Sequence, residues 1–215
     1  MVILGLTGSI GMGKSTAARM LRRMGVPVCD SDATVHGLLA RGGSAVPAID
    51  AAFPGVVVNG AVDRRALGAA VFGNPAALKA LEAILHPRVQ AAQRAFLFQA
   101  ARRGVRVACL DIPLLFETGG QRRVDRTIVV TAPLAVQKAR VLARPGMTPE
   151  KFAGILTRQM PDAEKRRRAD FVVNTGDGRL ATRRALREII AKAKRIPGRH
   201  WPPRGFHPGD SIHHG

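Results

Sequence analysis

The sequence predicts an α/β fold with three layers, in which a parallel β-sheet lies between helices on both of its faces. Five short runs rich in Val and Ile alternate along the chain with helical stretches, and this order produces parallel strands joined by helical crossovers. The runs lack a regular alternation of apolar and polar residues, as expected for strands buried on both faces. The predicted strands span residues 2–6, 26–32, 105–113, 126–133 and 170–176.

The first of these strands leads into a glycine-rich loop and a helix. Gly8 is followed by four residues and then by Gly13, Lys14 and Ser15, which is the spacing of a P-loop. The glycines let backbone N–H groups point inward, and the start of the next helix adds positive partial charge, so the segment suits a polyphosphate. Lys14 is expected to reach the β- and γ-phosphates, and Ser15 to ligate Mg²⁺. The residues predicted to bind the nucleotide in this P-loop NTPase core are Gly8, Gly11, Met12, Gly13, Lys14, Ser15 and Thr16.

The lengths of the segments divide the chain further. A length of 215 residues suits one domain with inserted subdomains, which we predict over residues 1–195. Its core comprises residues 1–32, 104–133 and 166–195. Residues 33–103 are mainly helical and long for one strand-to-strand connection, so they can form an acceptor-binding insert. The predicted helices span residues 16–24, 33–39, 75–101, 134–143, 149–159 and 180–195.

Two further segments stand out by composition. Residues 134–165 form a predicted helical hairpin rich in Arg and Lys, placed where a mobile lid can close over phosphates. A solvated surface hairpin is the alternative. Residues 196–215 concentrate Pro, Gly and His without an apolar period, which predicts a disordered tail. Its histidines are not accompanied by a Cys or carboxylate cluster that would fix a metal site.

The overall composition limits the possible partners. With 34 Lys and Arg against 15 Asp and Glu, the net charge is +19, which favours anionic partners. Nucleic acid is not the expected primary partner, because the nine aromatic residues do not cluster into a stacking platform. No uncharged apolar run reaches 18 residues, so no membrane association is expected, and no signal peptide is evident. Cys29 and Cys109 lie in apolar runs, which indicates buried thiols in a reducing cytoplasm.

Carboxylates at the ends of strands are candidates for orienting or deprotonating a phosphate acceptor. Asp30 and Asp32 end the second predicted strand, and residues two apart in a strand face the same side. The carboxyl ends of parallel strands share one edge of the sheet, which is also where a P-loop lies. Asp32 is alternatively the N-cap of the following helix. Asp111 ends the third strand and is a Walker-B-like candidate near Mg²⁺, and these residues alone do not rank it against Asp32.

Arginines in the predicted lid can neutralise phosphate charge. Arg140 and Arg144 are four residues apart, which places them on one face of a helix and suits a clamp on a triphosphate. The alternative is that both belong to a solvated surface of a basic chain.

Several motifs together resemble the dephospho-coenzyme A kinase family. They occur in the family's order and cover residues 1 to about 190. The motifs are GLTGSIGMGKSTAARML from Gly5, VCDSDATVH from Val28, ILHPRV from Ile84, IPLLFETG from Ile112 and RRADFVVNTG from Arg167. The P-loop is shared by many kinases, whereas the other motifs are far more particular.

The resemblance implies transfer of the γ-phosphate of ATP to the ribose 3′-hydroxyl of dephospho-coenzyme A, the last step of coenzyme A synthesis, with Mg²⁺ required. It assigns Asp32 as the catalytic base. Together with the P-loop spacing and the lid placement argued above, this makes Asp32, Lys14, Arg140 and Arg144 the predicted catalytic residues. It places Arg64 and His86 near the acceptor and Asn174 and Gly176 beside the adenine. Pro113, Leu114 and Leu115 would wall the acceptor pocket. From the sequence alone, His86 before Pro87 also fits the start of a helix.

The sequence departs from the family pattern in the lid. Pro145 stands where an acidic or amide residue is usual, and Gly154 where many members have Arg, although Arg158 can substitute one turn later. The competing hypotheses are another small P-loop kinase with a different acceptor, and a P-loop regulator or RNA-binding protein. The sequence indicates a monomer or a small homo-oligomer without deciding between them.

Overall fold

Two compact units make up the chain in the computed structural model, which describes residues 1–202. Among the described residues, the first unit comprises 1–29 and 99–202, and the second comprises 30–98. The division falls close to residues 33 and 103, the limits expected for the insert. The segment 134–165 belongs to the first unit and does not separate from it.

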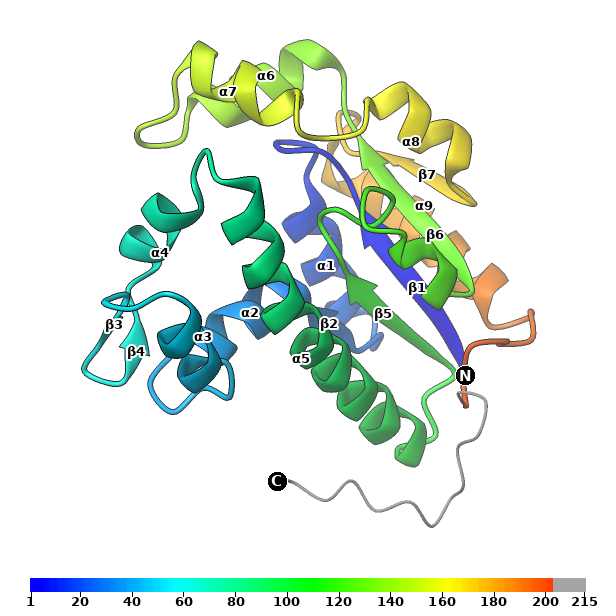
Figure 1. The fold of residues 1–215 in the computed structure, drawn as a ribbon. Coiled ribbons are helices and arrows are strands. Elements are labelled where there is room, and N and C mark those ends of the chain that lie inside the picture. The colour runs from blue at the N-terminus through cyan, green and yellow to red at the C-terminus, as the bar shows by residue number, and fades with distance from the viewer. Residues whose placement is uncertain (203–215) are drawn as a thin grey trace. The chain divides into compact units, whose positions relative to one another are not determined.

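A five-stranded sheet forms the centre of the first unit, with strand order β2-β5-β1-β6-β7 (Figure 1). β1 pairs in parallel with β5 and with β6, and β6 pairs in parallel with β7. All five predicted strands are therefore present, each at its expected place in the chain. The strands are β1 (Val2–Thr7), β2 (Val28–Asp30), β5 (Val107–Asp111), β6 (Arg126–Thr131) and β7 (Phe171–Asn174).

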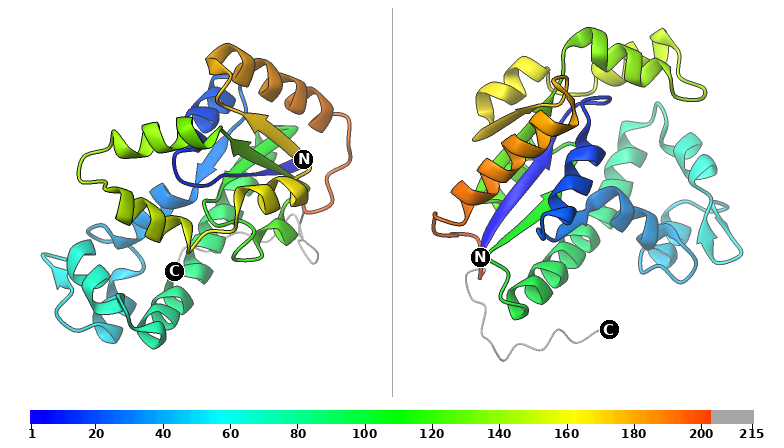
Figure 2. Two further views of the ribbon diagram at one scale, coloured as in Figure 1. Left: turned by 90° about the horizontal axis from the view of Figure 1, so that it is seen from above. Right: turned by 180° about the vertical axis from the view of Figure 1, so that it is seen from behind.

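Helices lie on both sides of this sheet, so the predicted α/β fold is confirmed. α1 and α9 lie side by side over one face, as the right-hand view of Figure 2 shows. Leu4 and Leu6 of β1 are fully buried in the same apolar cluster as Leu21 of α1 and Leu186 of α9. The helices of this unit are α1 (Lys14–Arg23), α6 (Leu134–Leu142), α7 (Pro149–Leu156), α8 (Asp162–Arg168) and α9 (Gly178–Ala193), with the 3-10 helix η1 (Gly120–Arg123).

The opposite face is covered by the segment between β5 and β6. A Cβ atom added to Gly5 would lie 3.0 Å from side-chain carbons of both Leu115 and Val124. Burial of these apolar side chains contributes about 1.5–3 kcal/mol each. Cys29 and Cys109 are buried and form no disulfide, which confirms that part of the prediction.

The prediction that residues 196–215 are disordered is wrong for the first of these residues. Ile196 packs against the apolar core, and the N–H groups of Arg199 and His200 donate hydrogen bonds to Asp125 Oδ1. The chain after α9 is therefore attached to the first unit by backbone donors, which composition does not reveal. The other histidines of the tail, His207, His213 and His214, lie outside the described residues.

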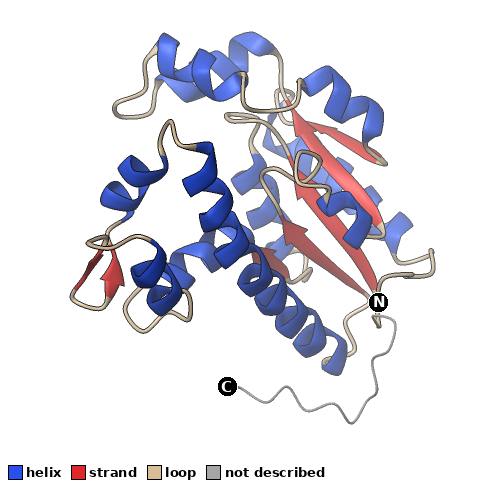
Figure 3. Ribbon diagram, in the orientation of Figure 1, coloured by secondary structure: helices blue, strands red, loops and turns tan. Residues whose placement is uncertain are grey.

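The second unit is mainly helical and contains a small hairpin that the sequence analysis missed (Figure 3). Asn59 and Gly60 form the two-residue turn of this hairpin with φ values of 52° and 75°, as expected for an Asn-Gly turn. Ile49, Phe53 and Leu67 form the centre of the unit's own apolar cluster. Its elements are α2 (Ser31–Leu39), α3 (Val46–Ala52), β3 (Val57–Val58), β4 (Ala61–Val62), α4 (Arg64–Val71) and α5 (Pro75–Arg102), the last of which ends in the first unit.

Pro87 lies inside α5, so the alternative that it begins a helix is wrong. Proline lacks the backbone N–H that an interior helical position normally donates. The next residue adds side-chain bonds at this point: Arg88 donates from Nη1 to Ile84 O at 2.7 Å and from Nε to Ser44 O at 3.1 Å.

Candidate active site

The phosphate loop connects β1 to α1 and depends on its glycines. Gly11 and Gly13 have φ values of 78° and 88°, which side chains other than glycine rarely adopt. At Gly8 an added Cβ atom would lie 2.4 Å from Val130 Cγ2 and 2.8 Å from Val130 O. No side chain caps the start of α1, and its first turn contains no acidic residue. No side-chain cap or acidic group therefore competes with an anion at this helix start.

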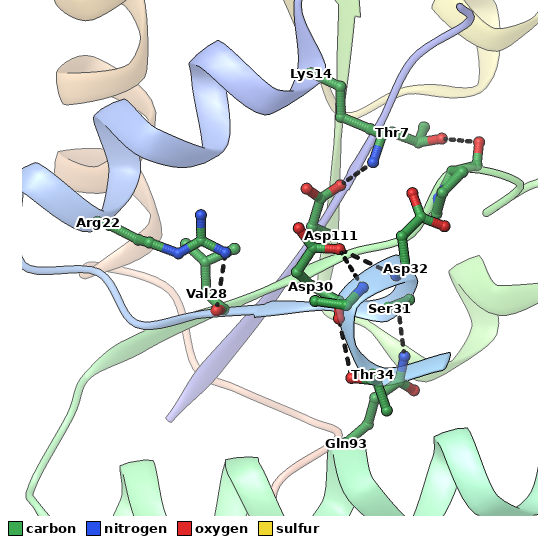
Figure 4. Close-up of polar contacts among 12 residues, drawn as sticks. Thr7, Lys14, Arg22, Val28, Asp30, Ser31, Asp32, Thr34, Gln93 and Asp111 are labelled. Carbon is green, nitrogen blue, oxygen red and sulfur yellow. Dashed lines mark hydrogen bonds and ion pairs between the residues drawn. The ribbon is translucent and has the colours of Figure 1, made fainter. Parts of the chain in front are cut away.

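Lys14 forms an ion pair beneath this loop. Its Nζ lies 2.7 Å from Oδ1 of Asp111, the last residue of β5 (Figure 4). The side chain of Asp111 is 2% exposed and that of Lys14 is 16% exposed. A carboxylate buried to this degree requires a compensating charge. The Lys14 ammonium supplies that charge to Asp111. Ser15 follows Lys14 in the first turn of α1 and is exposed.

The lid helix α6 contacts the loop through Arg140. The Arg140 guanidinium donates to Thr175 Oγ1 at 2.8 Å and to Thr175 O at 2.9 Å, with a longer contact of 3.5 Å to Gly11 O. Thr175 Oγ1 in turn donates to Met12 O at 2.9 Å. Arg144 lies beyond the end of α6 at Leu142. Arg140 and Arg144 therefore do not share one helix face, and the prediction that they do is wrong.

Two glutamines of the lid region hold the loop residue Ile10 from both sides of its peptide unit. Gln137 Nε2 donates to Ile10 O at 2.8 Å, and the Ile10 N–H donates to Gln159 Oε1 at 3.1 Å. Neither contact could be predicted from the sequence, because both join segments far apart in the chain.

Three lid positions are involved where the sequence departs from the family pattern. Pro145 lies between α6 and α7, Gly154 lies within α7, and Arg158 lies just after α7.

A cavity of about 520 Å³ lies beside the loop in the first unit. Met12 lines it, and the Met12 sulfur accepts the Ala132 N–H at 3.0 Å. Asp162 contributes a carboxylate whose Oδ2 accepts the Thr131 hydroxyl at 2.8 Å. Its Oδ1 is buried and has no hydrogen-bond partner within residues 1–202. Other lining residues are Pro133, Leu134, Gln137, Arg166, Val172 and Asn174.

Asn174 and Gly176 form the turn after β7 at this cavity. Asn174 Oδ1 accepts the Gly176 N–H at 2.9 Å, and Asn174 Nδ2 donates to Asp177 Oδ1 at 2.8 Å. A Cβ atom at Gly176 would lie 2.5 Å from Pro133 Cδ. The Asn174 amide therefore shapes the turn. The lack of a side chain at Gly176 lets the backbone of the turn lie close to Pro133.

The segment after β5 carries the three residues expected at the acceptor. Leu114 is 39% exposed and Pro113 is half-buried, whereas Leu115 is fully buried. The Pro113 carbonyl accepts the Thr7 hydroxyl at 3.0 Å, which ties this segment to the end of β1 (Figure 4). Only Pro113 and Leu114 present side-chain surface, while Leu115 supports them from the core.

Asp30, rather than Asp32, is the N-cap of α2. Asp30 Oδ1 accepts the backbone N–H groups of Asp32 at 3.0 Å and of Ala33 at 3.1 Å (Figure 4). Both the capping alternative for Asp32 and the argument from strand alternation are thus wrong, because Asp32 already lies in the first turn of α2. Its side chain is exposed and is not used as the cap.

Arg64 and His86 both lie in the second unit on exposed helix positions. Arg64 begins α4, and its Nη1 lies 3.2 Å from Nδ1 of His36 in α2. His86 lies in the middle of α5. The partner of Arg64 was not predicted, although His36 ends one of the motifs that carried the family resemblance.

A phosphate loop after the first strand of a parallel sheet, with a basic lid reaching that loop, defines a P-loop kinase. The family model described as dephospho-CoA kinase matches residues 2–182. The chain belongs to the dephospho-coenzyme A kinase family, and it is a transferase that catalyses the final step of coenzyme A biosynthesis.

Named relatives agree with this assignment. The dephospho-CoA kinase of Mesorhizobium japonicum is 60% identical over 190 residues, covering 88% of this chain and 95% of that protein. The dephospho-CoA kinase of Paramagnetospirillum magneticum is 67% identical over 166 residues, covering 77% and 78%. A Thermus thermophilus protein of known structure has a TM-score of 0.76 and 41% identity, with 89% of this chain and 97% of that chain covered.

Proposed function

We propose that the first unit binds ATP with its base in the cavity beside the loop and its triphosphate on residues 8–16. The observation that carries this proposal is that Met12 belongs both to the phosphate loop and to the lining of the cavity. Asp162 Oδ1 gives further support, because a buried acceptor without a partner suits a ligand donor such as the exocyclic amine of adenine. Asn174 and Gly176 shape the wall of this base site.

We propose that the triphosphate is bound by the loop residues Gly8, Gly11, Met12, Gly13, Lys14, Ser15 and Thr16. Their backbone N–H groups and the first turn of α1 supply partial positive charge, and Lys14 supplies a full charge. Arg140 adds to it from a fixed position, because its hydrogen bonds to Thr175 leave other guanidinium donors for a phosphate. Arg144, on the loop after α6, joins the clamp when the lid closes.

Mg²⁺ is part of this proposal, and the side chains fit it. The Ser15 hydroxyl is exposed in the first turn of α1, and Asp111 places a carboxylate beside Lys14. Within residues 1–202 no cluster of three or more His, Cys, Asp or Glu could hold a metal ion. A few oxygen ligands suit Mg²⁺, which usually completes its shell with water and substrate phosphates. When bound, the ion neutralises charge on the β- and γ-phosphates.

We propose that the second unit binds dephospho-coenzyme A and that Asp32 takes the proton from its ribose 3′-hydroxyl. The exposed carboxylate of Asp32 is not used to cap α2, because Asp30 performs that role. In the second unit, Arg64 and His86 supply positive or hydrogen-bonding groups for the anionic acceptor. Pro113 and Leu114, which belong to the first unit, offer apolar surface backed by Leu115.

The transfer step follows from these roles. The hydroxyl oxygen attacks the γ-phosphorus as the bond to the bridging oxygen of ADP breaks, and Lys14 with Arg140 stabilises the developing negative charge. Because phosphoryl transfer has a loose transition state, Asp32 accepts the proton late. The products are coenzyme A and ADP.

Other properties follow from the same assignment. Within residues 1–202 no helix combines the length and apolarity that a membrane crossing needs. The absence of a disulfide between Cys29 and Cys109 supports work in a reducing cytoplasm. The charge of +19 suits two polyanionic substrates without a nucleic-acid partner. We propose that the protein is a monomer or a small homo-oligomer.

Gly176→Ala tests the position of the base. The added Cβ atom would lie 2.5 Å from Pro133 Cδ, so the turn must move away from the cavity. We expect KM for ATP to rise about tenfold, because small displacements in a binding site are costly, while KM for dephospho-coenzyme A changes little. Steady-state kinetics with each substrate varied in turn provide the measurement.

Gly154→Ala is the matched control for that substitution. Gly154 lies in α7, and an added Cβ atom meets nothing within 4 Å. This variant should keep the KM for ATP and gain about 0.5–1 kcal/mol of stability. An unchanged KM for ATP in Gly176→Ala would show that the base binds elsewhere.

A further inference from the structure

We propose that Glu117 and Lys165 are positioning residues for the nucleotide, because their ion pair fixes the segment 159–165 that reaches both the phosphate loop and the cavity. We call these residues the junction segment. The inference rests on the proposed ATP site and adds two residues that take no part in the chemistry.

The ion pair lies inside the first unit. Lys165 Nζ is 2.9 Å from Glu117 Oε1, and the Lys165 side chain is 0% exposed. The same Glu117 oxygen accepts the Met160 N–H at 2.8 Å. Glu117 comes from the segment after β5, and Lys165 comes from α8. One carboxylate oxygen thus holds the junction segment near each of its ends.

The junction segment contacts the nucleotide site at two places. Gln159, next to Met160, accepts the Ile10 N–H of the phosphate loop at 3.1 Å. Asp162 lines the cavity and accepts the Thr131 hydroxyl at 2.8 Å. A shift of the segment would therefore move Ile10 and Asp162 together, which affects the triphosphate and the base of the same ligand.

Stability alone does not explain the pair. Glu117 Oε2 is buried without a hydrogen-bond partner within the described residues, so the cost of removing both charges from water is only partly offset. Burial would raise the pKa of Glu117, but the neighbouring Lys165 ammonium and the Met160 N–H outweigh it and hold the pKa below its ordinary value. The Glu117 carboxylate is thus positioned by two groups of the junction segment, the Lys165 Nζ at 2.9 Å and the Met160 N–H at 2.8 Å.

The test compares single and double substitutions. Glu117→Gln and Lys165→Met each leave one buried charge without its partner, so each should lower Tm. The double variant removes both charges and should recover most of that loss. The proposal requires that kcat/KM for ATP in the double variant stays about tenfold or more below wild type, with KM for dephospho-coenzyme A unchanged. ATP dissociation constants from calorimetry provide a readout that does not depend on turnover.

The exposed pair Glu164–Arg168 on the same helix is the matched control. Glu164→Gln combined with Arg168→Met should change neither Tm nor ATP affinity appreciably, because exposed ion pairs contribute little. Recovery of both Tm and ATP affinity in the Glu117–Lys165 double variant would show that the pair is only structural and would overturn the proposal.

Gln159→Leu decides the matter if the double variant does not fold. It leaves the buried pair intact and removes the acceptor of the Ile10 N–H. A tenfold loss of ATP affinity is expected, and unchanged affinity would overturn the inference. Failure of the proposed ATP site gives a different result, since Gly176→Ala would then also leave ATP affinity at the wild-type value.

Discussion

Asp32→Asn is expected to lower kcat about a hundredfold or more while changing the dissociation constant for ATP little. The proposed role of Asp32 is to accept the proton of the acceptor hydroxyl, which a neutral amide cannot do. The helix is expected to remain intact, because Asp30 rather than Asp32 caps α2. Single-turnover kinetics with saturating substrates measure the effect on the chemical step.

Asp50→Asn provides the control for that variant. Asp50 is an exposed carboxylate in the same unit, and its substitution changes the net charge by the same amount. This variant should turn over at the wild-type rate. If Asp32→Asn also kept its full kcat, Asp32 would not be the base and Asp111 would become the leading candidate.

Lys14→Met is expected to lower kcat/KM for ATP by about a hundred- to a thousandfold. The variant loses the charge that faces the phosphates, and it also leaves the buried carboxylate of Asp111 without its partner at 2.7 Å. Removing one partner of such a pair typically costs about 3 kcal/mol of stability. Kinetics should therefore be measured below the variant's Tm, with circular dichroism confirming that it is folded.

Lys192→Met is the control for the lost charge. Lys192 is exposed in α9, far along the chain from the loop, and its substitution should leave kcat/KM for ATP and Tm close to wild type. A folded Lys14→Met variant with wild-type kcat/KM would contradict the role given to Lys14 and with it the proposed triphosphate site.

The sequence predicted what depends on local patterns. The phosphate loop was recognised because the spacing of Gly8 and Gly13 is fixed by the backbone geometry that a phosphate site requires. All five strands of the sheet were recognised because buried parallel strands are short and apolar. Their predicted ends extended too far, since Asp30 and Asp32 both suit a helix start and only the cap geometry shows which one is used.

Two of the features that were predicted wrongly or not at all do have a local sequence pattern. Pro145 disfavours a helical conformation at Arg144, so α6 was bound to end before Arg144 could share a face with Arg140. The Asn59-Gly60 pair between Val-rich residues is a typical hairpin turn. In contrast, Pro87 lies inside α5 beside the side-chain hydrogen bonds of Arg88 to Ile84 O and Ser44 O, which no local pattern indicates.

The rest could not be predicted because it consists of contacts between distant segments. Gln137 and Gln159 both hold Ile10, and Glu117 pairs with Lys165 inside the first unit. In the sequence Gln137, Gln159 and Lys165 are ordinary polar positions of a basic chain, and Glu117 belongs to the IPLLFETG motif with no sign of its partner. Only the fold shows that Lys165 is buried rather than part of a solvated helix face.

The choice of phosphate acceptor tests the proposed function most directly. ADP release is measured with Mg²⁺ and ATP while dephospho-coenzyme A, adenosine, AMP, CMP and shikimate are offered in turn, and each product is analysed by mass spectrometry. Turnover is expected only with dephospho-coenzyme A, with a product heavier by one phosphoryl group at the ribose 3′-oxygen. Efficient turnover with AMP, CMP or shikimate instead would contradict the acceptor roles of Asp32, Arg64 and His86.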